Sequence, residues 1–192
     1  MTKDNDQFGA RELAVLLREL RTVIDTLVIG DVVELGCYKG LTSLEMQRTL
    51  MGIKKLYLYD SFAGLPPKVA QDQSPAGIQF KEGELPASKQ DVINLFKKSG
   101  LPMPSIKKAW FSDLTCQDLP EHIALAFLDG DFYQSITDSL KLIWPKLSKG
   151  AVVLVDDYQN AALPGVQKAV DEWLKIHPAR LRVEASLAVI KV

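Results

Sequence analysis

Apolar residues recur along the chain in short blocks separated by polar turns. From Gly9 to Val28 they fall at helical spacing, with arginine and glutamate on the other side, which predicts an amphipathic helix. Later blocks are shorter and continuously apolar, as is typical of buried strands. These predicted strands are Asp31–Gly36, Lys55–Tyr59, Ile106–Phe111, Ile123–Leu128 and Ala151–Val155.

Helical patterns alternate with these strands. Ser88 is a plausible N-cap for one of the helices, and Gly100 is placed to end it. The predicted helices are Leu41–Met51, Ser88–Lys98, Ser135–Leu147 and Pro164–Ile176. Two short strands near Arg180–Glu184 and Leu187–Ile190 predict a closing hairpin. The order indicates an α/β fold: a mostly parallel central sheet, helices on both faces and an antiparallel hairpin at one edge.

The length of 192 residues fits one domain, which we assign to 1–192. Within it, 1–30 is the N-terminal helical region. The polar segment 61–87 is rich in proline and glycine, and no helix or strand pattern interrupts it. Loops of this length inside a domain are usually functional or disordered, so we predict an active-site loop there.

Composition narrows the classes of partner and compartment. The net charge is −1 and the pI is near 6.1, so no positive field exists to hold nucleic acid. The chain begins with polar residues, and no apolar run is long enough for a signal peptide or a membrane span. Cys37 and Cys116 are far apart and show no metal-ligand spacing, which favours free thiols in a reducing cytoplasm.

Carboxylates follow the predicted strands. A lone aspartate at a strand end is equally well explained as a turn residue, but the ends of parallel strands meet at one sheet edge. Packing several like charges there requires a compensating cation or ligand. Asp129, Asp156 and Asp157 offer oxygen ligands suited to Mg²⁺ or another divalent cation. Asp131, two residues after Asp129, can face the same pocket and handle a proton.

The turn after the first strand contains Gly36 and Gly40, which let the backbone approach a ligand closely. It lacks the middle glycine of the dinucleotide fingerprint. Asp60 ends the second strand, where a carboxylate can accept hydrogen bonds from both hydroxyls of a ribose. These features indicate a nucleoside-containing cofactor.

In this order and spacing, four segments resemble the macrocin O-methyltransferase family, a branch of the class I S-adenosylmethionine-dependent methyltransferases that acts on sugar hydroxyls of natural products. The segments are Glu34–Gly40, Tyr59–Pro66, Asp129–Ser135 and Val155–Tyr158. The resemblance implies the Rossmann-like class I methyltransferase fold. It also implies S-adenosyl-L-methionine as cofactor and a small-molecule hydroxyl acceptor, and it leaves a homodimer open.

The resemblance also implies residue roles. Cofactor contacts would come from Glu34, Gly36 and Gly40 for the methionine part, Asp60 for the ribose, and Ser112 and Asp113 near the adenine. Divalent-metal ligands would be Asp129, Asp156 and Asp157, and Asp131 would be the general base. Antibiotic-tailoring members carry a longer N-terminal region, so we expect a more open acceptor pocket here, or one shaped by segment 61–87.

Three alternatives remain at this point: a nucleotide-dependent oxidoreductase, a non-catalytic S-adenosylmethionine-binding module, and a methyltransferase with an amine acceptor. Tyr133 and Tyr158, beside the predicted metal site, are equally compatible with acceptor contact and with structural burial. The tryptophans, Trp110 among them, are expected to pack in the core or at its edge.

Overall fold

A computed structural model describes residues 8–75 and 80–192 of the chain. Parts of two predicted segments, 1–7 of the N-terminal region and 76–79 of the long loop, lie outside the described residues. One sheet joins seven strands in the order β3-β2-β1-β4-β5-β7-β6. Their bounds are Asp31–Leu35 (β1), Leu56–Asp60 (β2), Ser105–Lys108 (β3), Ile123–Leu128 (β4), Leu147–Val155 (β5), Arg180–Glu184 (β6) and Leu187–Lys191 (β7).

Strands β1 to β5 pair in parallel with one another, and β7 pairs antiparallel with both β5 and β6. The predicted parallel sheet and edge hairpin are therefore confirmed. Every residue of β4 is buried, as expected for a central strand covered on both faces. The strand order reverses between β1 and β4, and crevices form at such a point, beyond the carboxyl ends of the strands.

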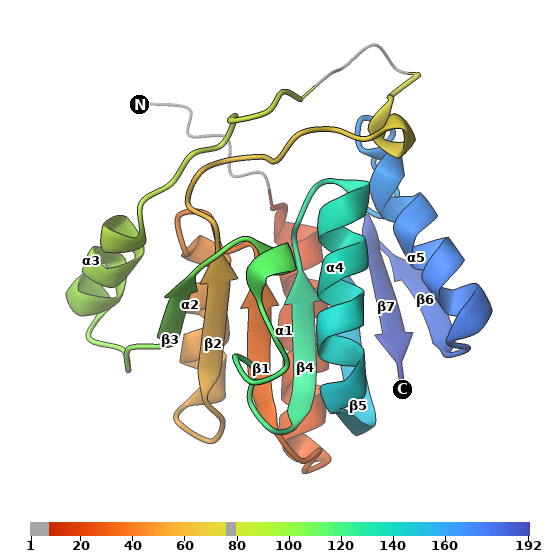
Figure 1. The fold of residues 1–192 in the computed structure, drawn as a ribbon. Coiled ribbons are helices and arrows are strands. Elements are labelled where there is room, and N and C mark those ends of the chain that lie inside the picture. Colours follow the sequence, from red (N-terminus) through yellow and green to blue (C-terminus); the bar gives the residue numbers. More distant parts are fainter. Residues whose placement is uncertain (1–7, 76–79) are drawn as a thin grey trace.

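Helices cover both faces of the sheet (Figure 1). They are Ala10–Asp25 (α1), Leu41–Leu50 (α2), Lys89–Ser99 (α3), Tyr133–Ile143 (α4) and Pro164–Ile176 (α5). One core cluster contains side chains of α1, α2 and α3, and the other contains side chains of α4 and α5. The Ser88 hydroxyl accepts a hydrogen bond from the Gln90 N–H, and Gly100 ends α3 in the left-handed conformation, as the sequence predicted.

The predicted helix Ser135–Leu147 is wrong at both ends. The helix begins at Tyr133 and ends at Ile143, and a 3-10 turn, Trp144–Lys146, follows it. Pro145 lies in this turn, and proline disrupts a helix interior. β5 then begins at Leu147, earlier than predicted, because Leu147 pairs with Ile123 of β4. The third strand is shorter than predicted and gives way to the 3-10 turn Phe111–Asp113.

No helix in the described part of the chain combines the length and the apolar character that a membrane crossing requires. The thiols of Cys37 and Cys116 are both free, the first buried and the second exposed.

Candidate active site

A cavity of about 950 Å³ opens at the carboxyl edge of the sheet. Its wall contains residues that follow β1, β2, β4 and β5, so it occupies the crevice expected where strand order reverses. Of the site residues predicted from sequence, those that line it are Glu34, Gly36, Asp60, Ser112, Asp129, Asp131, Asp156 and Asp157. Gly40 and Asp113 do not line the cavity, although residues next to them in the sequence do.

The turn after each of these strands contains a residue other than glycine with positive φ. The φ angles are 46° at Tyr38, 52° at Phe62, 59° at Asp131 and 56° at Asp157. This conformation is uncommon outside glycine, and clusters of it are found where the surrounding structure holds a functional site. The four turns therefore form one constrained rim around the cavity.

Glu34 is buried at the end of β1, with 1% of its surface exposed. Its Oε2 accepts a hydrogen bond from the Ser43 hydroxyl of α2, while Oε1 has no hydrogen-bond partner among the described residues. Burial raises the pKa of Glu34 to about 8, and the nearby charge of Asp60 adds to the rise. Glu34 thus lines the cavity wall with a carboxyl group whose Oε1 is buried and unsatisfied.

Gly36 and Gly40, in the turn between β1 and α2, have different structural roles. Gly36 has φ +94°, and a Cβ there would overlap the carbonyl oxygen of Asp129. Gly40 has φ +81° as the N-cap of α2, and a Cβ there would lie 3.0 Å from Val92 of α3. The first glycine thus lets the ends of β1 and β4 approach, and the second lets α2 and α3 pack closely.

Asp60 holds the turn between β1 and α2. Its Oδ2 accepts hydrogen bonds of 2.9 Å from the backbone N–H groups of Cys37 and Tyr38, and Oδ1 accepts one of 2.7 Å from Phe62. A carboxylate offers about four acceptor positions, so roughly one remains for a ligand. The sequence predicted a ribose contact and missed this structural role.

The wall beyond β3 is formed by the 3-10 turn Phe111–Asp113 and the residue before it. Ser112 lines the cavity with Trp110 and Phe111, whereas Asp113 contacts the Ser112 hydroxyl from behind at 3.4 Å. Trp110 was expected in the core or at its edge; it does not lie in the core, because 38% of its surface is exposed at this wall.

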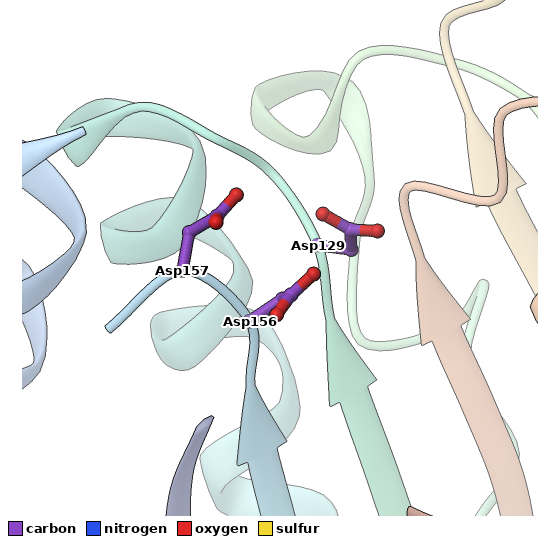
Figure 2. Close-up of side chains that lie close together, drawn as sticks. All are labelled: Asp129, Asp156 and Asp157. Atoms are coloured by element: carbon purple, nitrogen blue, oxygen red, sulfur yellow. The ribbon is translucent and has the colours of Figure 1, made fainter. Parts of the chain in front are cut away.

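Asp129, Asp156 and Asp157 gather at the ends of the neighbouring strands β4 and β5 (Figure 2). One carboxylate oxygen from each lies within 4.8 Å of the others. Burial raises the pKa of Asp129 well above its usual range, and the charges of Asp156, Asp131 and Asp157 add to this. Bonds of about 2.1 Å to Mg²⁺ allow ligand oxygens up to about 4.2 Å apart, so a small closure suffices. An all-oxygen donor set whose charges repel one another fits a hard cation.

Asp131 shares the cavity with these three aspartates. Burial, followed by the charges of Asp157 and Asp60, raises the pKa of its carboxyl group. Asn160, which the sequence analysis missed, also lines the cavity and donates a hydrogen bond of 2.8 Å to Oδ1 of Asp157. Its own Oδ1 accepts the Ala162 N–H at 2.9 Å, so the side chain of Asn160 is fixed on both sides.

The two tyrosines beside the aspartates face α5. The Tyr133 hydroxyl donates to Glu172 at 2.7 Å, and the buried Tyr158 hydroxyl donates to Asp171 at 2.6 Å. Both tyrosines thus tie α5 to segments that contain the acidic residues, which favours their structural interpretation.

A seven-stranded sheet of this order, with an acidic cavity at the reversal point, defines the class I methyltransferase fold. A family model described as macrocin-O-methyltransferase matches residues 5–186. The chain belongs to the macrocin O-methyltransferase family, as the sequence motifs indicated.

Curated relatives carry the same kind of name. A tetracenomycin 4'-O-methyltransferase of Streptomyces olivaceus, named for a dimethoxy-rhamnosyl substrate, is 30% identical over 86% of this chain and 66% of its own length. Demethyldecarbamoylnovobiocin O-methyltransferase of Streptomyces niveus is 29% identical with the same coverage. The match thus spans just under two thirds of the length of these relatives.

Solved structures agree on the fold. The O-methyltransferase NovP superposes with a TM-score of 0.83 at 26% identity, over 95% of this chain and 80% of that one. The calicheamicin methyltransferase CalS11 gives 0.76 at 19% identity, over 96% and 80%, which supports the fold alone. Because the chain belongs to an O-methyltransferase family, we discard the oxidoreductase alternative.

Proposed function

We propose that this protein transfers a methyl group from S-adenosylmethionine to a hydroxyl group of a small molecule, with a divalent cation such as Mg²⁺ in the site. The observation that carries the proposal is the convergence of Asp129, Asp156 and Asp157 within 4.8 Å of one another, in the cavity that Asp131 also lines. A cation site beside a carboxylate suits activation of a hydroxyl group better than methylation of an amine.

Names of the relatives support a sugar hydroxyl as the acceptor class. The tetracenomycin enzyme is named for a rhamnosyl 4'-hydroxyl, and a relative from Micromonospora griseorubida, 28% identical over 92% of this chain and 72% of its own length, is named a mycinamicin III 3''-O-methyltransferase. We propose a sugar moiety of a natural product as substrate. We also propose a cytoplasmic location, because both thiols are free. We propose no nucleic-acid partner, because the net charge is near zero.

For the cofactor, we assign the end of the cavity at β1 and β2. Glu34 and Gly36 line it there and would face the methionine part, with Gly40 shaping the turn from behind. The remaining acceptor position of Asp60 would take a ribose hydroxyl. Ser112, supported by Asp113, would lie near the adenine ring.

When bound, the cation supplies Lewis acidity that lowers the pKa of the acceptor hydroxyl, and the cofactor supplies the methyl group. Asp129, Asp156 and Asp157 would hold that cation beside the acceptor oxygen. Asp131 would accept the hydroxyl proton as the oxygen attacks the methyl carbon, whose bond to sulfur breaks so that S-adenosylhomocysteine is left. The constrained rim of turns fixes these groups before the reactants arrive, and such orientation accounts for much of a rate enhancement.

Two experiments test the proposal. S-adenosylhomocysteine should raise the melting temperature whereas NAD should not, because a ligand that binds only the native state stabilises it. Methyl transfer to a panel of glycosylated acceptors should then stop in excess EDTA and return with Mg²⁺. Full activity in EDTA would refute the metal part of the proposal, and equal stabilisation by both nucleotides would refute the cofactor assignment.

A further inference from the structure

The segment after β2 does not return directly to the sheet. It crosses beside the carboxyl edge and reaches the start of α5, where the 3-10 turn Ala70–Asp72 lies next to that helix (Figure 1). At this point Asp72 is buried, with 2% of its surface exposed. A buried carboxylate in a loop needs compensation, and its contacts show where the compensation comes from.

Asp72 accepts hydrogen bonds through both oxygens. Oδ1 accepts the N–H of Tyr133, the first residue of α4, at 2.7 Å, and Oδ2 accepts the N–H of Val69 at 3.0 Å. Oδ1 also lies so close to Gly165, in the first turn of α5, that a Cβ on Gly165 would overlap it. First turns of helices offer unpaired N–H groups and a partial positive charge, so they stabilise a carboxylate.

The two N–H groups belong to different parts of the site. Val69 lines the cavity together with Pro66 and Pro67, so one bond fixes this stretch of wall. Tyr133 begins α4 immediately after Asp131 and Phe132, so the other bond fixes the segment with the proposed base. A third contact, from the Ser74 hydroxyl to the Ala161 carbonyl oxygen at 2.8 Å, holds the same segment against the turn that contains Asn160.

We propose that Asp72 is a positioning residue for the acceptor: it sets the wall of Pro66, Pro67 and Val69 at a fixed place relative to Asp131. This inference rests on the proposed function. The cofactor end of the cavity, at Glu34 and Asp60, has its own hydrogen bonds to Ser43, Cys37 and Tyr38, which do not involve Asp72. Loss of the Asp72 contact should therefore impair use of the acceptor and spare cofactor binding.

Gly165 allows the contact to be broken in two ways. Asp72→Ala removes the carboxylate, whereas Gly165→Ala leaves its charge and displaces it, since the new methyl group takes the place of Oδ1. Each variant should raise the acceptor KM about tenfold or more, as expected for a misplaced substrate wall. The Kd for S-adenosylhomocysteine should stay within about twofold of the wild-type value. The double variant should be no worse than Asp72→Ala alone, because the two changes act on one contact.

Asp91→Ala is the matched control, because Asp91 is an exposed carboxylate in the first turn of α3. It should change neither constant. The inference is overturned if Gly165→Ala leaves the acceptor KM unchanged, if the two losses add in the double variant, or if cofactor affinity falls in step with the acceptor KM. Hydrogen exchange at the Tyr133 amide tests its hydrogen bond to Asp72 independently of activity. Exchange should be faster in both single variants than in the wild type. An inactive wild-type protein would refute the proposed function, whereas unchanged Tyr133 exchange would refute the Asp72 contact.

Discussion

The carbonyl oxygen of Asp129 occupies the space that a side chain on Gly36 would need. The turn after β1, which we propose binds the cofactor, therefore packs against the end of β4, where Asp129 belongs to the proposed metal site. Gly36, with a proposed cofactor role, and Asp129, with a proposed metal role, are therefore packed directly against each other. A substitution of Gly36 should therefore displace the backbone of Asp129.

Gly36→Ala should destabilise the fold by more than about 2 kcal/mol, since it combines a disfavoured φ with a collision against backbone. S-adenosylhomocysteine should no longer stabilise the protein. Gly52→Ala is the control: φ is +78° there, but a Cβ would meet nothing within 4 Å, so only the conformational cost of about 1 kcal/mol applies. Chemical denaturation measures both. Equal losses in the two variants would contradict the packing argument.

Asp156→Asn should stabilise the metal-free protein at pH 8 and abolish its response to Mg²⁺. Burial and the charge of Asp157 raise the pKa of Asp156, so removing its charge relieves a cost on the order of 1–2 kcal/mol. Wild-type protein should instead gain stability on titration with Mg²⁺. Thermal unfolding in EDTA and in Mg²⁺ separates the two effects. An equal Mg²⁺-induced rise in both proteins would show that the cation binds elsewhere.

Glu34 should make the stability of the ligand-free protein fall as the pH rises. Its folded pKa of about 8 lies above the ordinary value of 4.5, so between these values the folded state holds a proton that the unfolded chain releases. Stability from this group is complete below about pH 4.5 and is lost on the way to pH 8. Glu34→Gln keeps an acceptor for Ser43 and cannot titrate.

The measurement is the difference in free energy of unfolding between Glu34→Gln and wild type, from pH 5 to pH 8 in EDTA. The free energy of unfolding of Glu34→Gln should rise steadily relative to that of the wild type as the pH increases across this range. Glu121→Gln removes a charge from an exposed glutamate and serves as the control. A difference that stays constant with pH would mean that burial does not keep Glu34 protonated.

Asn160→Ala should weaken Mg²⁺ binding about ten- to a hundredfold, because groups that orient metal ligands commonly have effects of this size. The variant removes the 2.8 Å hydrogen bond to Asp157. Asn160→Asp retains an acceptor for the Ala162 N–H, loses the donor to Asp157 and adds a negative charge, so comparison with Asn160→Ala separates loss of the hydrogen bond from the effect of charge. Titration calorimetry measures the affinity, with Asn94→Ala, at an exposed amide of α3, as the control. If both Asn160 variants bind Mg²⁺ with wild-type affinity, Asn160 does not support the proposed metal site.

Local pattern was enough where each residue's neighbours in sequence decide its structure. α5 was predicted with its observed bounds, because Pro164 favours a first helical turn and the apolar spacing continues to Ile176. β4 was likewise predicted residue for residue. The start of β5 was missed, because Leu147 joins the sheet through its pairing with Ile123 rather than through its own apolar pattern.

The sequence by itself determined the sheet, its edge hairpin, the family and the row of carboxylates at strand ends, since the carboxyl ends of parallel strands meet at one edge. Only the tertiary structure decided which of these residues share a cavity: Ser112 lines it and Asp113 does not. It also decided that Asp60 holds a backbone turn and that Asp72 joins the long segment to α4 and α5. These relations connect residues far apart in the chain through main-chain N–H groups, which every residue type but proline possesses and no sequence pattern distinguishes.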